Sequence, residues 1–381
     1  MSARVVIAPE RWGSVDAQEV AQAMARGWQA RSPSVQVRIC AQSNGGSDLV
    51  TVVAAAHPDA AMGVLTSDTA LGSTQPVPYV QVEDEGARSA YLAMSLPTPA
   101  GQQPASPASS HAVGQAIREL VAAGVDRVVV GLADSGTLDG GSGLIAGLAG
   151  AAEDHEHPDA ELATTARDVL RDHGVRLVAA YDVGIPLLGL GGAAATAQGD
   201  LGLDPYLAQA AEARMSRWAQ EVAQALPARP DLLTGKAHRH DRTPGSGAGG
   251  GAGFALAALG AELRPAAQVV AEATGLWDAI GAGDLAVTGT LIFDWRQLTD
   301  SVVLQVGSTA QSLARPAVLL AGRVDVGRRE LMSLGFSGGY GVVQSPRNPL
   351  PGDAAQILAA AEGLAYRVAG TWTPTHSTFD G

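Results

Sequence analysis

Short apolar runs alternate with segments of helical periodicity at the start of the chain. Arg4–Ala8 is a mainly apolar run that ends at Pro9, which indicates a buried strand. Ala17–Trp28 then repeats apolar residues on one helical face, and Val35–Ile39 alternates as a strand does. A strand, a helix and a strand in this order predict a parallel sheet with a crossover helix.

The same alternation returns from Leu285 to the end of the chain. The predicted elements are strands at Leu285–Thr288, Ala317–Ala321 and Tyr340–Val343, a loop at Gly289–Asp294, and helices near Gln297–Leu304, Arg328–Leu334 and Asp353–Val368. Both ends of the chain therefore carry the pattern of a doubly wound α/β sheet. We expect residues 1–60 and 280–381 to form one discontinuous, Rossmann-like α/β domain with a mainly parallel sheet.

The middle of the chain, residues 61–279, has mixed patterning and is expected to form a second, inserted α/β domain. Its predicted elements are strands at Met62–Thr66, Pro78–Val82, Arg127–Val130 and Arg176–Ala180, and helices at Ala112–Ala123, Glu161–His173, Asp204–Leu226, Phe254–Leu259 and Pro265–Thr274. Pro97–Pro107 and Asp182–Gly202 are predicted to be loops.

Two glycine-rich stretches dominate this inserted region. Gly131–Gly143 follows the strand at Val128–Val130, and Gly245–Gly253 opens a later helix. Glycine lets the backbone approach a ligand closely, and a helix N-terminus favours an anion. We expect the two loops to face a shared gap and to hold a triphosphate by their main-chain amides. The alternative is that both are tight turns between strands and helices.

Composition narrows the class of protein. The 381 residues are 46% hydrophobic, and the formal net charge is −13. This charge argues against nucleic acid and anionic membrane partners, because the pattern contains no basic stripe to neutralise phosphates. We see no apolar run of the about 20 residues that a membrane span needs, and no signal-peptide pattern. The single cysteine, Cys40, excludes an internal disulfide and favours a reducing cytoplasm.

Several familiar motifs are missing from the sequence. It has no G-x-x-x-x-G-K-[ST] stretch, so the P-loop class is excluded, and no G-x-S-x-G stretch in the context of a serine hydrolase. The spacing of glycines in Gly131–Gly143 differs from the dinucleotide fingerprint. His155, His157 and His173 are interpreted as surface residues, since nothing in the sequence fixes them as metal ligands.

Several stretches resemble, in chain order, the bacterial two-domain glycerate kinase family (type I). They are Val6–Pro9 with Gly13-Ser14, Gly131–Gly143 with Asp139-Gly140-Gly141 intact, Asp182-Val183 with Pro186-Leu187, Gly245–Gly253 with Leu259–Pro265, and Asp284–Gly289. The resemblance covers nearly the whole chain. It implies transfer of the γ-phosphoryl group of ATP to a hydroxyl of D-glycerate or a related small hydroxy acid, with Mg²⁺, and it leaves a homodimer open.

The chain departs from the family pattern where charged residues are usual. Asn44–Asp48 replaces the family's D-G-G-E-G-T, and Gly289–Asp294 keeps an aspartate but has lost the glutamate of G-E-G-x-x-D. Glu10-Arg11-Trp12 stands where the family has a lysine nearby, and Ile185 replaces an asparagine. A catalytically silent paralogue, acting as a small-ligand-binding or regulatory protein, is therefore the alternative hypothesis.

Phosphoryl transfer needs charge neutralisation, positioning of the phosphates and a group that accepts the hydroxyl proton. Asp134 and Asp139 are the predicted Mg²⁺ contacts, and Asp139 and Asp294 the predicted catalytic acids. Helix capping is the alternative role of both Asp139 and Asp294, and an Asx-turn that of Asp134. The predicted nucleotide contacts are Ser135, Gly136, Thr137, Gly140, Gly141, Gly247, Gly249, Gly250 and Gly251, and the predicted substrate contacts are Asn44, Arg264 and Lys236.

Overall fold

The computed structural model describes residues 2–68, 74–84, 86–96, 109–152, 159–200, 202–227, 235, 238–345 and 347–373. The chain forms two compact units. Unit 1 consists of Met1–Asn44, Thr51–Ala56 and Ala267–Gly381, and unit 2 consists of Gly45–Val50 and His57–Ala266. The sequence placed its second domain boundary at residue 279, so the segment 267–279 lies in unit 1 rather than in the inserted region.

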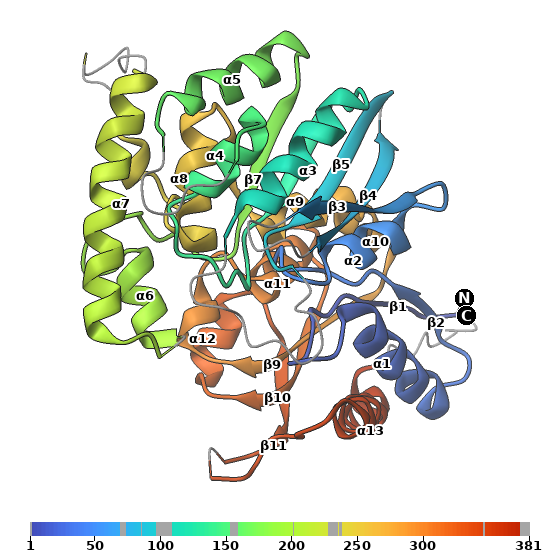
Figure 1. The fold of residues 1–381 in the computed structure, drawn as a ribbon. Coiled ribbons are helices and arrows are strands. Elements are labelled where there is room, and N and C mark those ends of the chain that lie inside the picture. Colours follow the sequence, from blue (N-terminus) through green and yellow to red (C-terminus); the bar gives the residue numbers. More distant parts are fainter. Residues whose placement is uncertain are drawn as a thin grey trace. The chain divides into compact units, whose positions relative to one another are not determined.

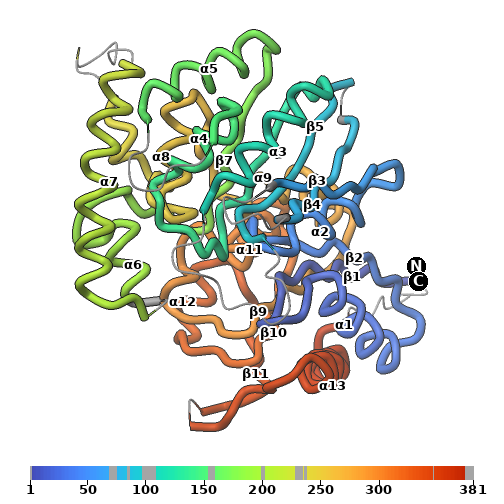
Figure 2. Tube along the Cα trace, in the orientation of Figure 1, coloured from blue at the N-terminus to red at the C-terminus, as the bar shows by residue number. Residues whose placement is uncertain are grey.

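Unit 1 is built on a parallel sheet whose strands run in the order β2-β1-β9-β10-β11. These strands are β1 (Arg4–Ile7), β2 (Gln36–Ile39), β9 (Leu285–Phe293), β10 (Ala317–Val324) and β11 (Gly338–Val343). The first strand of the chain therefore lies beside a strand that is distant in the sequence, with Val6 opposite Ala286. Figure 2 shows these N-terminal and C-terminal segments of the trace.

Helices cover both faces of this sheet. Alternate strand residues such as Val6, Ala286 and Leu319 pack with α9 (Ala266–Ala273), α10 (Leu276–Ala282), α11 (Val302–Ser312) and α12 (Arg328–Ser333). On the other side, α1 (Ala17–Arg31) packs along α13 (Ala354–Trp372). The approach of these two helices is close, because a Cβ added at Gly27 would lie 2.1 Å from the Glu362 carbonyl oxygen. Unit 1 is thus doubly wound.

Unit 2 contains a mixed sheet in the order β3-β4-β5-β6-β7-β8. These strands are β3 (Ala61–Asp68), β4 (Thr74–Asp84), β5 (Ala87–Ala93), β6 (Arg127–Gly131), β7 (Arg176–Tyr181) and β8 (Glu262–Pro265). β3, β4 and β5 pair antiparallel, and β5 to β8 pair parallel. Parallel pairing places the carboxyl ends of β6 and β7 at one edge, from which the first glycine-rich loop leaves.

The helices of unit 2, seen in Figure 1, enclose a large apolar cluster with its strands. They are α3 (His111–Ala122), α4 (Ser142–Ala149), α5 (Leu162–Asp172), α6 (Ala193–Asp200), α7 (Pro205–Ala225) and α8 (Ala252–Ala258), with 3-10 turns η1 (His240–Arg242) and η2 (Ala248–Gly251). α2 (Leu49–Ala56) begins in unit 2 and ends in unit 1. α3 and α4 touch through glycine, since a Cβ at Gly114 would lie 2.1 Å from the Leu144 carbonyl oxygen.

The predicted mainly parallel α/β fold is confirmed, but some elements differ. The predicted loop Gly289–Asp294 is wrong, because β9 continues to Phe293 and pairs with β10, with Ile292 opposite Arg323. The predicted helix near Gln297–Leu304 is two pieces, η3 (Trp295–Leu298) and then α11, for which Ser301 is the N-cap. Glycine and threonine in the strand suggested a loop, yet a neighbouring strand supplies the hydrogen bonds that hold it extended.

Four short elements were not predicted at all. They are β5, β8, α6 and α10, and α6 lies inside the predicted loop Asp182–Gly202. Each is short or rich in small residues, so its periodicity is weak, and packing against neighbours decides its conformation. The predicted loop Pro97–Pro107 lies outside the described residues.

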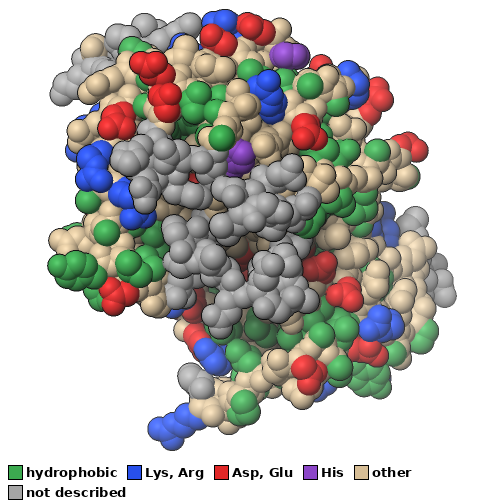
Figure 3. Space-filling view, viewed as in Figure 1, with side chains coloured by type: hydrophobic (Ala, Val, Ile, Leu, Met, Phe, Trp, Pro, Cys, Tyr) green, Lys and Arg blue, Asp and Glu red, His purple; other side chains and the backbone are tan. Residues whose placement is uncertain are grey.

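Side chains of both charges lie close together on part of the surface. Figure 3 shows acidic and basic side chains close together on the drawn face at the end where α5 lies, and on this helix Arg171 pairs with Asp168 and Asp172. In the part of the chain that the structure describes, every helix is too short or too polar to cross a bilayer.

Candidate functional site

The first glycine-rich loop begins where β6 ends, at Gly131. The chain then bends toward the neighbouring strand, because the Leu132 amide donates to the Ala180 carbonyl of β7 at 2.9 Å. A second loop meets it here: a Cβ added at Gly131 would lie 2.2 Å from the Gly45 carbonyl oxygen. The segment that follows Asn44 therefore approaches the carboxyl end of β6. Asn44 itself, a predicted substrate contact, is half-buried and belongs to unit 1.

The two glycine-rich loops touch each other directly. The Gly140 amide donates to the Gly250 carbonyl at 3.0 Å, and the Thr137 hydroxyl donates to the Gly249 carbonyl at 2.9 Å. A Cβ at Gly250, where φ is +63°, would lie 1.8 Å from the Thr137 carbonyl oxygen. Glycine is required here by positive φ and by the close approach of two backbones. We call this contact of residues 137–143 with residues 247–251 the glycine junction.

Asp139 organises the turn at the glycine junction. Its Oδ2 accepts hydrogen bonds from the Ser110 amide at 3.0 Å, the Ser110 hydroxyl at 2.6 Å and the Gly143 amide at 3.3 Å, and its Oδ1 accepts one from the Gly141 amide at 2.8 Å. The Ser110 hydroxyl in turn accepts from the Leu144 amide at 2.8 Å. Asp139 and Ser110 thus satisfy the amides at the start of α4, which is the capping role left open by the sequence.

This arrangement changes the expected use of the main chain. The amides of Gly140, Gly141 and Gly143 donate to protein groups, so in the structure they hold the glycine junction together rather than face a phosphate. The second loop is also enclosed, with Gly249 and Gly251 both buried.

An exposed arm precedes the glycine junction. Asp134 and Gly136 are exposed, and Ser135 between them is half-buried. Asp134 has φ of +54°, a left-handed conformation that aspartate tolerates better than most residues. The Ser135 hydroxyl lies 2.8 Å from the Thr137 hydroxyl and accepts from the Thr137 amide at 3.2 Å. Of the first loop, this arm is the most solvent-exposed part.

Helix α7 holds the glycine junction from one side. The Trp218 Nε1 donates to the Gly140 carbonyl at 3.1 Å, and a Cβ at Gly140 would lie 3.0 Å from the Trp218 ring. Elsewhere on α7, Glu212 Oε1 accepts from the Gly189 amide at 2.7 Å. The sequence predicted a helix at Asp204–Leu226. Trp218 lies on its buried face, and nothing in the sequence indicates this hydrogen bond.

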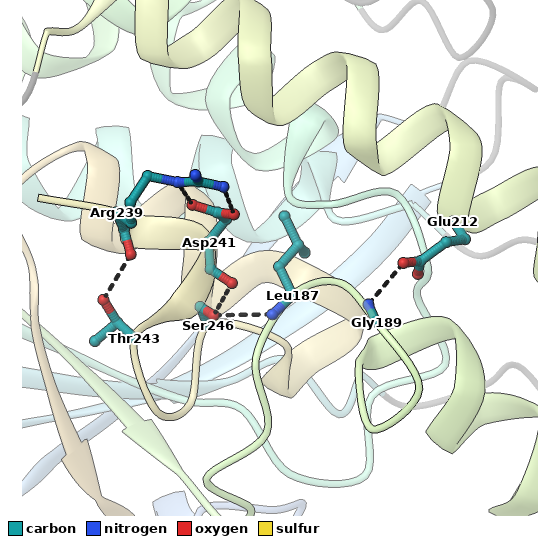
Figure 4. A network of polar contacts seen from close by, with 7 residues as sticks. All are labelled: Leu187, Gly189, Glu212, Arg239, Asp241, Thr243 and Ser246. Atoms are coloured by element: carbon teal, nitrogen blue, oxygen red, sulfur yellow. Dashed lines mark hydrogen bonds and ion pairs between the residues drawn. The ribbon is translucent and has the colours of Figure 1, made fainter.

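Ser246 connects three segments of unit 2, as Figure 4 shows. This fully buried hydroxyl donates to the Asp241 carbonyl at 3.1 Å and accepts from the Leu187 amide at 2.9 Å. The Gly247 amide donates to the Ile185 carbonyl at 3.0 Å, which joins the second glycine-rich loop to the loop after β7. The sequence analysis did not single out Ser246, since a serine among glycines is typical of any turn.

Arg239 and Asp241 form an ion pair beside Ser246 (Figure 4). Arg239 Nε and Nη2 lie 2.8 and 2.6 Å from the two carboxylate oxygens. Hydrogen bonding to Arg239 lowers the pKa of Asp241 below its ordinary value, although partial burial opposes the shift. The pKa of His240 is lowered by burial and by the neighbouring His238. The basic segment 238–242, which precedes the second glycine-rich loop, thus has the charge of Arg239 paired with Asp241.

The remaining predicted residues lie elsewhere. Arg264 is on β8 opposite Ala180, with its Nε 3.8 Å from Glu262 Oε1. Asp294 is in unit 1, where it caps η3: its Oδ1 accepts from the Arg296 amide at 2.9 Å. Lys236 lies outside the described residues.

A comparison with known proteins decides the family. The chain matches the glycerate kinase family over residues 5–372. It belongs to the glycerate kinase family. An uncharacterized protein of Mycobacterium bovis is 32% identical over 96% of this chain and 91% of its own length. The glycerate 2-kinase of Escherichia coli is 26% identical over 85% of this chain and 87% of its own length.

A solved structure shares the fold of this chain. It is assigned as glycerate kinase 2 of Salmonella typhimurium LT2, and the match covers 97% of this chain and 98% of that one, with a TM-score of 0.73 and 24% sequence identity. At this identity the likeness concerns the fold, and it agrees with the mainly parallel α/β architecture described above.

The family implies a nucleotide and a divalent cation. The described residues differ in how well they suit such a cation. Within the described residues, no group of three or more His, Cys, Asp or Glu side chains is arranged to hold a metal. Mg²⁺ needs less, since one or two carboxylates with phosphate oxygens and waters suffice. The exposed Asp134, next to Ser135 and Gly136, fits that requirement. Asp139 fits it poorly, because its carboxylate already accepts the hydrogen bonds of the turn.

Proposed function

We propose that this protein is an ATP-dependent kinase that transfers the γ-phosphoryl group to a hydroxyl of D-glycerate or a related small hydroxy acid. The observation that carries the proposal is the family match over residues 5–372. It is supported by the relative named glycerate 2-kinase, which aligns with 85% of this chain. A reducing, cytoplasmic setting is part of the proposal, because Cys40 is the only cysteine of the sequence and is buried.

In this proposal the exposed arm Asp134–Gly136 serves the nucleotide. Asp134 would hold Mg²⁺, which neutralises charge on the phosphates during transfer, and Ser135 and Gly136 would donate to phosphate oxygens. The glycine junction keeps the arm in place through the bonds between Thr137 and Gly249 and between Gly140 and Gly250.

The test is a coupled assay for ADP release with D-glycerate, ATP and Mg²⁺, followed by identification of the phosphorylated product. We expect turnover by the wild type and a loss of about 100-fold in kcat/KM for Asp134→Asn, because a metal-binding carboxylate is removed. Asp172→Asn, which alters an exposed aspartate of α5, is the matched control and should leave turnover unchanged. Equal activity of both variants would remove Asp134 from the site.

A second candidate function is a catalytically silent protein that binds a small acid or nucleotide. The altered charged positions at Asn44–Asp48 and Gly289–Asp294 favour it. Thermal-shift measurements with ATP, ADP, Mg²⁺ and D-glycerate separate the two candidates, because a ligand of the native state raises Tm whether or not it reacts. Stabilisation without ADP release would support the silent protein, and ADP release would exclude it.

A further inference from the structure

The parallel sheet of unit 1 reverses its winding direction between β1 and β9. From β1 the chain passes through α1 to β2 on one side, and from β9 it passes through α11 to β10 on the other. In open parallel sheets, ligands bind outside the carboxyl ends of the strands at such a point. The residues that follow β1 and β9 are therefore the place in unit 1 where a small molecule is expected.

The backbone after β1 is fixed beside β9. The Ala8 amide donates to the Val287 carbonyl at 2.7 Å, and the Glu10 amide donates to the Gly289 carbonyl at 3.0 Å. The Thr288 hydroxyl adds a bond of 2.7 Å to the Ala8 carbonyl. Strand β1 itself ends at Ile7, but these bonds carry the chain onward along β9 and hold Glu10 beside that strand.

The Glu10 side chain is buried there, with 7% of the residue exposed. Its Oε1 accepts a hydrogen bond of 3.0 Å from Gln297 Nε2, and the same amide nitrogen lies 3.1 Å from the Thr290 hydroxyl. A buried carboxylate is expensive unless it is hydrogen-bonded, and such groups concentrate at functional sites. We call Glu10, Thr290 and Gln297 the β1/β9 edge cluster.

Gln297 is held in place by its own turn. The Gln297 amide donates to the Asp294 carbonyl at 3.2 Å, and the Ser301 hydroxyl donates to the Gln297 carbonyl at 2.6 Å. Asp294 therefore has a role here as the cap of the turn that presents Gln297. The side-chain orientation is set by the network, since a flipped amide would place oxygen against the Glu10 carboxylate.

The Gln297 Oε1 is buried and has no hydrogen-bond partner among the described residues. A buried acceptor left in this state is unfavourable, so its retention calls for an explanation such as a ligand. The cluster thus offers an amide oxygen beside a carboxylate, and both groups are acceptors. A ligand that contacts both must carry two donors, and two hydroxyl groups on neighbouring carbons provide them.

We propose that the β1/β9 edge cluster binds the two neighbouring hydroxyl groups of the small acid. The inference rests on the proposed function. Glu10 accepts a hydrogen bond from one hydroxyl, and Gln297 Oε1 accepts one from the second. Two acceptors select dihydroxy acids such as D-glycerate over monohydroxy acids such as D-lactate.

The first test removes the charge of Glu10 and keeps the shape. Glu10→Gln should weaken the calorimetric Kd for D-glycerate by about tenfold or more, because a charged acceptor of a hydroxyl hydrogen bond is replaced by a neutral one. Glu362→Gln, at a half-buried glutamate of α13 that pairs with Arg26 at 3.0 Å, is the matched control and should leave the Kd unchanged. If Glu10→Gln fails to fold, Glu10→Asp serves instead, because it keeps the charge and withdraws the oxygens from the hydroxyl.

The second test addresses the unpartnered oxygen. Gln297→Met keeps the length of the side chain but removes the amide. We expect the wild type to bind D-glycerate about tenfold or more tightly than D-lactate, and Gln297→Met to bring this ratio close to one. A Kd of Glu10→Gln for D-glycerate within about threefold of the wild type would overturn the role of Glu10, and an unchanged ratio in Gln297→Met would overturn that of Gln297.

Binding data keep this inference separate from the proposed function. If the wild type releases no ADP but binds D-glycerate, and Gln297→Met loses the preference over D-lactate, the kinase proposal fails while the binding site stands. If the wild type binds neither acid by calorimetry, the β1/β9 edge cluster is not an acid site and the inference falls.

Discussion

The two units place opposite kinds of structure at the carboxyl ends of their parallel strands. In unit 2 the chain after β6 enters the glycine junction, where the Gly140 amide and the Thr137 hydroxyl bond directly to the second loop. In unit 1 the chain after β1 enters a cluster with the buried carboxylate of Glu10 and the unpartnered oxygen of Gln297. At the edge in unit 2, polar groups bond two loops to each other. At the edge in unit 1, a buried acceptor has no hydrogen-bond partner among the described residues.

A conspicuous sequence motif and a candidate ligand site therefore need not lie in the same place. Glycine-rich loops draw attention because glycine permits close approach, but at Gly250 the atom approached is the Thr137 carbonyl oxygen of the protein itself. The unused acceptor belongs to Gln297, beside Glu10, where the sequence shows ordinary polar residues. Variants of the glycine junction should therefore lose stability, and variants of the β1/β9 edge cluster should lose ligand binding.

The largest effect on stability is expected at the glycine junction. Gly250→Ala combines a positive φ of +63° with a Cβ 1.8 Å from a carbonyl oxygen, so two backbones must separate. We expect a loss of about 4 kcal/mol or more in the free energy of unfolding, measured by urea denaturation, or failure to fold. Gly174→Ala is the matched control, because φ is +65° and nothing lies within 4 Å of the added Cβ; it should cost only about 1–2 kcal/mol.

The control makes this prediction decisive. If both variants lose the same free energy, the cost comes from backbone conformation alone. The two loops would then separate without penalty, and the contrast between the bonded loops of unit 2 and the unpartnered acceptor of unit 1 would lose its basis.

The next effect is expected at Asp139. An amide in Asp139→Asn must turn its NH₂ either toward the Gly141 amide or toward the donors of Ser110 and Gly143, so donor faces donor. We expect a loss of about 1–3 kcal/mol in urea denaturation. Asp204→Asn is the control: Asp204 caps α7 at an exposed position, where asparagine caps as well as aspartate.

Asp139→Asn also decides between the two roles considered for this residue. Loss of stability together with activity would indicate an organiser of the turn. Loss of kinase activity at an unchanged urea midpoint would indicate instead that the carboxylate acts as a metal contact or a base, as its place in the Asp139-Gly140-Gly141 motif suggested.

Much of the architecture follows from local pattern. The apolar run Arg4–Ala8 and the alternation after Leu285 predict parallel strands of one sheet, since each pattern can be recognised without its neighbours. The strand β9 extends beyond its predicted end because β10 pairs with residues such as Thr290, and such support from a distant segment leaves no local trace. The position of Asp204 as the N-cap of α7, by contrast, was predictable from the residue type and the proline that follows.

The candidate site was less predictable for the same reason. The glycine-rich loops were identified, but whether a glycine faces a ligand or another backbone depends on which segment packs against it. Glu10 follows a proline and precedes an arginine, a context typical of a solvated loop, and its burial arises only from the tertiary fold. Ser246 and Trp218 were missed because a turn serine and a core tryptophan have the same sequence signature whether or not they hold a loop.

The smallest expected effect lies at the rim of the glycine junction, where Arg239 pairs with Asp241. Because the pKa of Asp241 is lowered in the folded state, its contribution to stability is fully present above its ordinary value of 3.8 and is lost as pH falls through the lower folded pKa. Arg239 is 61% exposed, so the pair should contribute only about 0.2–1 kcal/mol at about pH 7. Urea midpoints of the wild type and Asp241→Asn should differ at about pH 7 and converge toward about pH 3. In the background Arg239→Gln the difference at neutral pH should shrink, and a difference that persists there would mean that Asp241 stabilises unit 2 through something other than this pair.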